Sequence, residues 1–410
     1  MSVFTSADFL IPREALLPDW AVIACDQFTS EPDYWQAVKA LAEDKPSAYH
    51  IIFPEAELGS GEQARIASIN ETMRRYLDAA IFRRFPDSYI YVERTLLDGS
   101  IRRGVVGAVD LDAYDYADAA VSPIRATERT VLERIPPRVH IREGACLELS
   151  HVMLLMDEAS CAVLDSLTAR GDALTPVYDF ELMQGGGRIR GRLVSGAEKE
   201  AFAARIEEYE RDTARRFEAL GRAPLLYAVG DGNHSLAAAK ACWEARKAQG
   251  AGPDHPARYA MVELQNIHDP SQRFEAIHRI VTGVKPQALL DACATLCAAG
   301  GHEVAWAAGE KRGVLFLDPA LGELPIAALQ PFLDRWLREH GGSIDYIHGE
   351  EVALRLAEAP DAVAFLLPGI SKDDFFRGIV MDGVLPRKTF SMGHAQEKRY
   401  SLDCRRITED

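Results

Sequence analysis

Residues 225–247 constrain the fold of this chain more than any other stretch. An apolar run with the length of a strand, Leu225 to Val229, leads directly into a polar turn, Gly230 to Ser235. An alanine-rich helical pattern then continues to Lys247. A strand, a tight turn and a helix start in this order are typical of α/β proteins, which place their sites where strands end and helices begin.

The turn combines groups that bind anions with groups that titrate. Glycine allows positive φ and a close approach of a ligand to the main chain, and the first turn of a helix offers free N–H groups and the positive end of the helix dipole. Asp231 and His234 are candidate catalytic residues. A structural interpretation needs only capping and dipole effects, but it leaves His234 unexplained. The candidate ligand-binding residues of the turn are Gly230, Gly232, Asn233 and Ser235.

Strand and helix patterns alternate along the rest of the chain, with hairpins inserted. The hairpins are predicted at 88–109, across Asp98-Gly99, and at 177–194, across three glycines. The pattern predicts a fold between α/β and α+β, with a mixed sheet, flanking helices and hairpin insertions. The expected parts are an N-terminal α/β lobe at 1–120, a central lobe with the turn at 121–282, and a C-terminal lobe with a packed tail at 283–410.

Three further elements are predicted from shorter patterns. An apolar run at 49–53 indicates a strand, and residues 128–135 indicate a helix that Pro136-Pro137 ends. Residues 286–298 indicate another helix, which would hold both Cys293 and Cys297.

Composition limits the classes of partner. The chain has 62 acidic and 46 basic residues and a net charge of −16, which argues against a nucleic-acid or anionic-membrane surface. No apolar run reaches the roughly 18 residues of a membrane span, and no signal peptide pattern is present. The seven cysteines lack zinc-knuckle spacing, and free thiols fit a reducing compartment. We expect a cytoplasmic protein whose partner is a small anionic metabolite, with no nucleic acid and no membrane; the oligomeric state is not indicated.

A second group of candidates lies between residues 122 and 151, where five arginines fall within eighteen positions. Arginine binds phosphate or carboxylate oxygens in a bidentate way, so Arg125 and Arg142 are candidate phosphate-binding residues. Glu148 and His151 stand three apart beside an apolar strand and form a candidate acid–base pair. The alternative is a solvated helix face of mixed charge, and Arg138 is expected on the surface.

Two further segments contribute candidates. Asp26 follows a short strand at 21–25 and is suited to orienting a histidine or holding a metal. Its neighbour Cys25 is a weaker candidate nucleophile, because buried cysteines are usually inert. In the tail, Lys388, His394 and Lys398 would either add positive charge to an anion site or form a solvated edge.

The common nucleotide-hydrolase and dehydrogenase motifs are missing. The chain has no G-x-x-x-x-G-K-[ST], no H-E-x-x-H, no G-x-S-x-G and no G-x-G-x-x-G after a strand.

Several motifs together resemble a widespread bacterial family, domain of unknown function 1015. The resemblance covers essentially the whole chain but implies no activity. It is carried by residues 24–30 (Ala-Cys-Asp-Gln-Phe-Thr-Ser), 125–128 (Arg-Ala-Thr-Glu), 230–235 (Gly-Asp-Gly-Asn-His-Ser), 345–349 (Asp-Tyr-Ile-His-Gly) and 388–395 (Lys-Thr-Phe-Ser-Met-Gly-His-Ala).

The usual form of that family's turn, Asp-Gly-His-His-Arg, is similar to a turn of the ParB/sulfiredoxin-like fold, which includes nucleotide-dependent free-serine kinases. Only Asp231, Gly232 and His234 match it here, because Asn233 and Ser235 replace the first histidine and the arginine. The missing arginine would be an obvious phosphate partner, and Arg125 or Arg142 would have to replace it.

These observations predict an enzyme, a phosphotransferase or phosphatase, that acts on a small phosphorylated metabolite or nucleotide. The resemblance to the fold of the free-serine kinases points to serine or phosphoserine as the substrate. The turn would hold the phosphate, and His234, or Glu148 with His151, would move the proton. Asp231 or Asp26 would orient the histidine or hold Mg²⁺, which prefers oxygen ligands.

Two other classes stay open. One is a non-catalytic sensor or scaffold that binds a small anion at the same turn. The other is a metal-dependent hydrolase that uses Asp231, His234 and His151.

Overall fold

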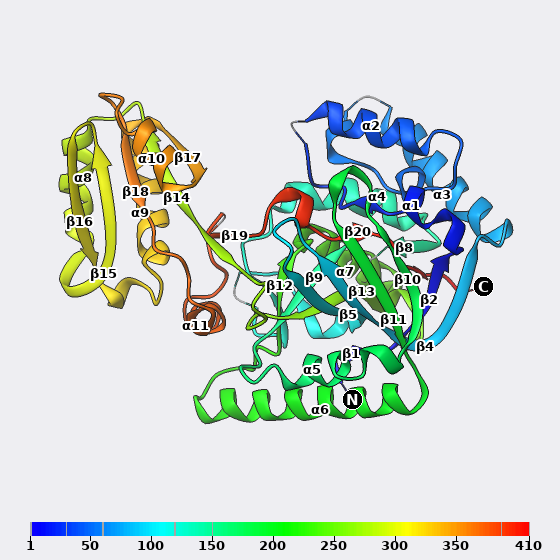
Figure 1. The fold of residues 1–410 in the computed structure, drawn as a ribbon. Helices are drawn as coiled ribbons and strands as arrows, with labels where there is room; N and C mark the ends of the chain where they lie inside the picture. The colour runs from blue at the N-terminus through cyan, green and yellow to red at the C-terminus, as the bar shows by residue number, and fades with distance from the viewer. Residues whose placement is uncertain are drawn as a thin grey trace.

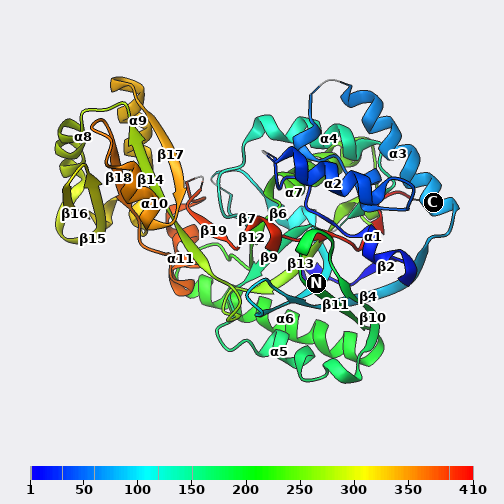
Figure 2. The ribbon, with the colours of Figure 1, turned by 45° about the horizontal axis from the view of Figure 1, so that its top comes forward.

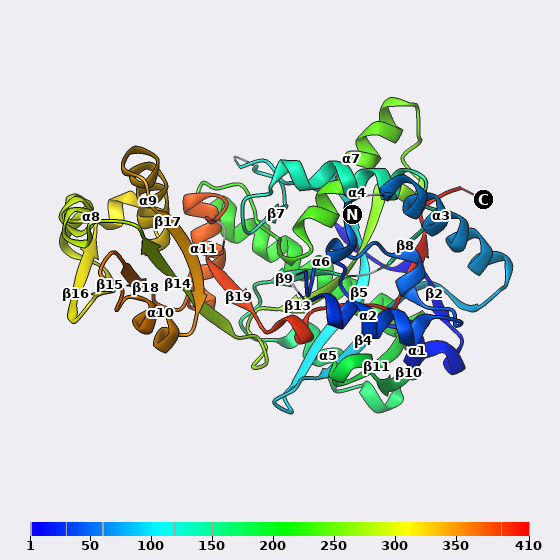
Figure 3. The same ribbon diagram turned by 90° about the horizontal axis from the view of Figure 1, so that it is seen from above.

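Two lobes of unequal size make up the protein. The computed structural model describes residues 2–29, 31–59, 61–118, 120–149, 151–386 and 388–409. Figure 1 shows a large lobe that carries both ends of the chain and a small lobe beside it. The same separation is visible from two further directions in Figures 2 and 3. No helix in the described part of the chain is long and apolar enough to cross a membrane.

A mixed sheet forms the centre of the large lobe. Its main path runs β6-β7-β12-β9-β13-β5-β4-β2-β21-β8, while β1 pairs with β5, and β11 pairs with both β4 and β10. The pairs β12–β7 and β13–β9 are parallel, whereas β12–β9 and β13–β5 are antiparallel. The thirteen strands described in this sheet are β1 (Phe4–Thr5), β2 (Ala7–Pro12), β4 (Phe82–Thr95), β5 (Ile101–Asp110), β6 (Tyr114–Asp115), β7 (Ile124–Ala126), β8 (Leu147–Leu149), β9 (Val152–Met156), β10 (Thr175–Glu181), β11 (Arg188–Val194), β12 (Tyr227–Asp231), β13 (Tyr259–Asn266) and β21 (Cys404–Arg406).

A second sheet forms the small lobe, in the order β16-β15-β18-β14-β17, with β19 paired to the start of β14. A separate two-stranded ladder joins two segments that are far apart in the sequence, β3 (Val22–Ile23) and β20 (Tyr400–Ser401). The strands of the small lobe are β14 (Phe274–Thr282), β15 (Cys297–Ala308), β16 (Lys311–Leu317), β17 (Ser343–His348), β18 (Val363–Leu366) and β19 (Phe390–Met392).

Helices cover both sides of the large sheet. In Figure 1, α5 and α6 lie on one side of it and α2, α3 and α4 on the other. The described helices are α1 (Leu17–Trp20), α2 (Pro32–Ala42), α3 (Glu62–Asp78), α4 (Ile135–Glu143), α5 (Ala162–Thr168), α6 (Gly196–Ala219), α7 (Asn233–Ala248), α8 (Pro286–Cys293), α9 (Pro325–His340), α10 (Glu350–Leu356) and α11 (Lys372–Asp382).

Strand β9, in the middle of the large sheet, is apolar along its whole length because both of its faces are covered. All five residues of β9 are buried, as expected for a strand with packed layers on both sides. One core cluster continues from the large lobe into the small one: Met153 and Leu155 of β9 belong to it together with Phe375 and Ile379 of α11. The two lobes therefore share part of their hydrophobic core.

The predicted mixed sheet with flanking helices and hairpin insertions is confirmed. Both hairpins are present, as β4–β5 and β10–β11. Three shorter predictions were wrong. Residues 48–51 form a 3-10 turn rather than a strand, and the predicted helix at 286–298 ends at Cys293, so that Cys297 begins β15.

The third error concerns residues 128–135. The helix lies further along the chain, at α4, and Pro136-Pro137 belongs to its first turn rather than to its end. Proline is favoured at the first helical positions because its missing N–H would have no partner there and its φ suits the helix. The shift places the two arginines of α4 beside α7.

Candidate functional site

The predicted strand, turn and helix at 225–247 are confirmed. β12 ends at Asp231, α7 begins at Asn233, and Gly232 between them has a φ of +79°. A Cβ at Gly232 would stand 3.0 Å from the Cα of Val152, so both conformation and space require glycine. Gly230 differs from the expectation, because it lies inside strand β12.

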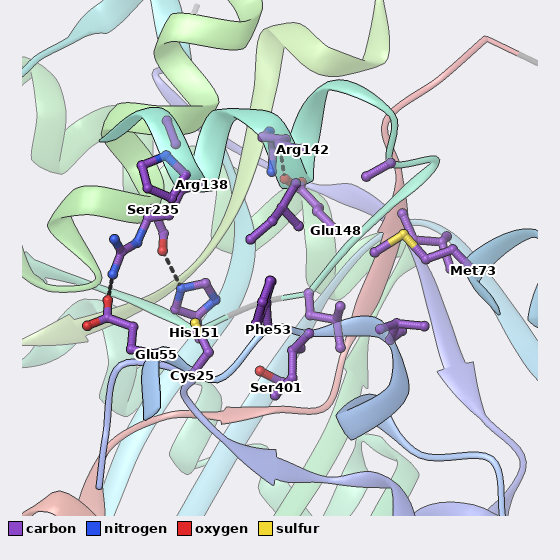
Figure 4. A pocket seen from close by; sticks show the side chains of 18 of the residues that line it. Cys25, Phe53, Glu55, Met73, Arg138, Arg142, Glu148, His151, Ser235 and Ser401 are labelled. Carbon is purple, nitrogen blue, oxygen red and sulfur yellow. Dashed lines mark hydrogen bonds and ion pairs between the residues drawn. The ribbon is translucent and has the colours of Figure 1, made fainter. Parts of the chain in front are cut away.

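Strand pairing brings His151 to this turn. β12 and β9 are antiparallel, with Asp231 opposite Met153, so the end of β12 lies beside the start of β9. His151 immediately precedes β9, and its Nε2 lies 2.7 Å from the Oγ of Ser235 (Figure 4). Two candidates that are 84 positions apart in the sequence therefore form one hydrogen-bonded pair.

The environment of His151 favours a neutral ring. Burial lowers its pKa, and the negative charges of Asp26 and Asp231 oppose this effect without cancelling it. A hydrogen bond to the main chain of Leu149 favours protonation of the ring, as a carbonyl acceptor does. In the tautomer with its proton on the other nitrogen, Nε2 is free to accept the hydroxyl proton of Ser235.

A second pairing brings Asp26 and Lys398 to the same place. In the β3–β20 ladder the N–H of Ala24 donates to the carbonyl of Arg399 at 2.9 Å, so the residues that follow β3 lie beside those that precede β20. The Nζ of Lys398 lies 3.7 Å from Oδ1 of Asp231. Burial raises the pKa of Asp231; Lys398 lowers it and Asp26 raises it further. The other oxygen, Oδ2, is buried and has no hydrogen-bond partner among the described residues.

His151 and Ser235 stand at one end of a pocket, shown in Figure 4. Helix α4 supplies Arg138 and Arg142, and Arg138 forms an ion pair with Glu55. The rest of the wall is mostly apolar. The pocket is lined by Cys25, Ile51, Ile52, Phe53, Glu55, Leu58, Met73, Pro137, Arg138, Ile141, Arg142, Ala145, Leu147, Glu148, Leu149, His151, Ser235, Ala238 and Ser401.

Glu148 lines this pocket but is engaged with cations. Its carboxylate accepts from Arg142 at 2.5 Å, from Nε of Arg405 at 2.8 Å and from the N–H of Met261 at 3.0 Å. Burial alone would raise its pKa, but the two guanidinium groups hold the pKa below its usual value. Glu148 and His151 are thus in one pocket without forming the predicted acid–base pair, since each has other partners.

Asn233 and His234 face a different segment. The Nδ2 of Asn233 donates to the carbonyl of Glu128 at 3.0 Å, and Nε2 of His234 accepts the N–H of Val131 at 3.1 Å. Burial, then the charges of Arg138 and Arg134, lower the pKa of His234 to about 4. The two side chains therefore fix the chain at 128–131. Nε2 of His234 is thus occupied by a main-chain N–H, whereas Nε2 of His151 lies next to a hydroxyl.

Arg125 is not brought to the pocket. It is buried on β7, and its Nη2 donates to the carbonyls of Ala223 and Pro224 at 3.2 and 3.0 Å. These carbonyls precede β12, whereas the turn follows it. A cation bound to main-chain carbonyls at the start of the strand cannot replace the arginine that the turn lacks.

Two pocket residues were not found from the sequence. Arg138 was expected on the surface, yet its side chain is only 13% exposed and lines the pocket. The available signal was its spacing of four from Arg142, which puts both on one helix face. Glu55, its partner, carried no signal. Ser30, the last residue of the 24–30 motif, lies outside the described residues.

The donors at this end of the pocket suit a hard cation better than zinc. Among the described residues, no group of three or more His, Cys, Asp or Glu could hold a metal ion, which argues against a site built from Asp231, His234 and His151. Mg²⁺ needs only one or two carboxylates plus phosphate oxygens, and the unpartnered Oδ2 of Asp231 has the chemistry of one such ligand. Burial, and then Asp26, raise the pKa of the Cys25 thiol to about 12, so this thiol stays protonated and unreactive.

The family follows from one comparison. The model of the family described as protein of unknown function DUF1015 matches residues 10–404. The chain belongs to this family. The predicted resemblance is thereby confirmed over almost the entire length of this DUF1015 protein. None of the curated proteins matches it.

Solved structures offer only a distant likeness to this DUF1015 protein. A free serine kinase in complex with AMP is 12% identical, with 72% of this chain and 90% of that chain covered and a TM-score of 0.37. SbnI with a C-terminal truncation, from Staphylococcus aureus, is 12% identical, with 70% and 83% covered and a TM-score of 0.36. A conserved hypothetical protein from Pyrococcus furiosus is 12% identical, with 73% and 94% covered and a TM-score of 0.33. At these values no ligand and no activity can be transferred to this chain.

Proposed function

We propose that this DUF1015 protein is an enzyme that binds a small phosphorylated metabolite or a nucleotide in the pocket of Figure 4 and catalyses phosphoryl transfer or phosphoester hydrolysis. The observation that carries the proposal is the 2.7 Å contact between Nε2 of His151 and Oγ of Ser235. A neutral imidazole within hydrogen-bond reach of a hydroxyl is the arrangement that general base catalysis requires.

Charge around this pair supports a phosphorylated ligand. Arg138 stands at the same end of the pocket and is kept in place by Glu55, and a guanidinium pairs well with phosphate oxygens. Lys398 adds a second positive charge beside Asp231. Positioning and charge stabilisation are the main contributions that a protein makes to phosphoryl transfer.

The carboxylates give the site a place for Mg²⁺. Asp231 and Asp26 would hold it, and the bound ion would neutralise charge on the phosphoryl group. Without an ion, the same two carboxylates stabilise the imidazolium that forms when His151 accepts a proton, since both favour its charged form. The general-base role therefore rests on His151 in either state of the site.

Phosphorus NMR on the purified protein tests the proposal. Phosphoserine, serine with ATP, and serine with ADP are each supplied with and without Mg²⁺. We expect turnover of at least one, and a loss of roughly 10²–10⁴-fold in rate for His151→Gln. His140→Gln is the matched control, because His140 is exposed on α4, and its rate should equal that of the wild type.

Four outcomes would each contradict a part of the proposal. A rate of turnover that is unchanged in His151→Gln would show that His151 is not the general base. A thermal shift with phosphorylated compounds but no turnover would instead identify a non-catalytic anion sensor. No turnover and no thermal shift would reject the phosphorylated ligand altogether, and tightly held stoichiometric zinc would indicate a metal-dependent hydrolase.

A further inference from the structure

The hydroxyl of Ser235 is both activated and accessible, and the proposed function uses only its contact with His151. Ser235 lies in the first turn of α7, where its N–H donates to the carbonyl of Gly232 at 3.0 Å, so its position is fixed by the turn. Its Oγ lines the pocket next to Nε2 of His151. The charges of Asp26 and Asp231 favour the protonated form of His151. A hydroxyl beside a base whose protonated form is favoured by nearby charges is the arrangement of an activated nucleophile.

We infer that Ser235 is a covalent nucleophile of this site, which attacks the phosphorus of a phosphate monoester and becomes phosphorylated. The inference rests on the proposed function and narrows it to a double displacement. In the first step the bond from Oγ to phosphorus forms and the bond from phosphorus to the ester oxygen breaks. Nε2 of His151 takes the hydroxyl proton and passes it to the departing oxygen, which leaves as an alcohol or phenol.

The second step restores the serine. A water attacks the phosphoserine phosphorus while His151 takes a proton from it, the bond from phosphorus to Oγ breaks, and Oγ recovers that proton from Nε2. Inorganic phosphate leaves. The departing alcohol keeps the proton that left Ser235, and a proton from the attacking water replaces it, so the cycle needs no co-reactant other than water.

The shape of the pocket indicates the leaving group. Figure 4 shows Ser235, His151, Arg138 and Glu55 at one end, with Phe53 and Met73 further along. An apolar wall buries an apolar part of a ligand and offers few partners for hydroxyl groups. The substrate class is therefore a phosphate monoester of an apolar or aromatic alcohol, whose phosphate lies at Arg138 and whose organic part lies along Phe53 and Met73.

The test uses the full chain with 4-nitrophenyl phosphate. Release of nitrophenolate is followed by absorbance, and acid-quenched samples are analysed by intact mass and peptide mapping. We expect a burst of nitrophenolate and one phosphoryl group on Ser235. Ser235→Ala should lose the phosphoprotein and at least about a hundredfold in rate. The matched control is Ser68→Ala, because Ser68 is an exposed serine on helix α3 that does not line the pocket; it should retain both.

Two results would show that Ser235 is not the nucleophile. One is Ser235→Ala turning over at the wild-type rate with an unchanged thermal midpoint, and the other is a phosphoryl group mapped to a different residue. Failure of this inference and failure of the proposed function are distinguishable. If NMR shows His151-dependent turnover of serine with a nucleotide and Ser235 is never phosphorylated, only the nucleophile is rejected; if neither reaction occurs, both are rejected.

Discussion

Replacing Glu148 with glutamine should destabilise the fold strongly although only one carboxylate oxygen becomes an amide. Glu148 is 7% exposed and compensates two guanidinium groups, those of Arg142 and Arg405. Arg405 is itself only 8% exposed at its side chain. Removing one partner of a buried ion pair costs about 3–5 kcal/mol, because the remaining charge is left uncompensated. The glutamine still accepts the N–H of Met261, so we expect the lower end, about 3 kcal/mol.

Urea denaturation at pH 7 measures this cost, and Glu244→Gln is the matched control. Glu244 also pairs with two cations, Lys240 and Lys247, but its side chain is 47% exposed, so its loss should cost less than about 1 kcal/mol. A decrease of under about 1 kcal/mol for Glu148→Gln, equal to that of the control, would show that the buried network contributes nothing beyond surface pairing.

Acid titration gives the same prediction a second, independent readout. The folded-state pKa of Glu148 is below the ordinary 4.5 because Arg405 and Arg142 outweigh its burial. The stabilisation from its charge is therefore fully present above pH 4.5 and is lost as the pH falls through the folded-state pKa. The difference in the free energy of unfolding between the wild type and Glu148→Gln should decrease on acidification. A difference that does not change with pH would contradict the ionic explanation.

Three other perturbations test the surroundings of the site by denaturation. Gly232→Ala should lower the free energy of unfolding by roughly 2 kcal/mol and Gly250→Ala by roughly 1 kcal/mol. Both glycines have positive φ, but only Gly232 lacks space for a Cβ. His234 has a folded pKa of about 4 against an ordinary 6.5, so wild-type stability should fall by about 1–2 kcal/mol from pH 6.5 to 4, allowing for partial exposure; His234→Gln should remove that slope. Arg94→Lys should cost about 3 kcal/mol and open residues 396–398 to protease, since a lysine cannot serve the four carbonyls that Arg94 binds; Arg84→Lys, at an exposed position, should change neither.

The turn at 230–235 could be predicted because its information is local. A strand pattern, a glycine with positive φ and a helix start are properties of consecutive residues, and the structure places β12, Gly232 and α7 accordingly. The hairpins at β4–β5 and β10–β11 were predictable for the same reason. The helix predicted at 128–135 was misplaced because a proline is compatible with both the end and the start of a helix, and Pro136-Pro137 lies at the start of α4.

The partners of candidate side chains could not be predicted, because they depend on pairing between distant segments. Arg125 and Arg138 are both arginines in one basic stretch, yet Arg125 donates to the carbonyls before β12 and Arg138 faces the pocket. Glu148 and His151 are three apart, yet β8 directs one to Arg405 and the entry to β9 directs the other to Ser235. Sequence spacing identified the residues but not their contacts.

The proposed chemistry of the site therefore depends on two strand pairings and one helix rather than on the turn alone. The turn itself supplies a hydroxyl at Ser235 and a carboxylate at Asp231. The antiparallel β12–β9 register places His151, the proposed base, beside Ser235. The β3–β20 ladder brings in Lys398 and Asp26, and α4 supplies Arg138. A hydroxyl without its base would be an ordinary serine in a first helical turn. A change that shifts the β12–β9 register should consequently abolish reactivity at Ser235 even when the turn keeps its own conformation, because the register alone sets the 2.7 Å distance to His151.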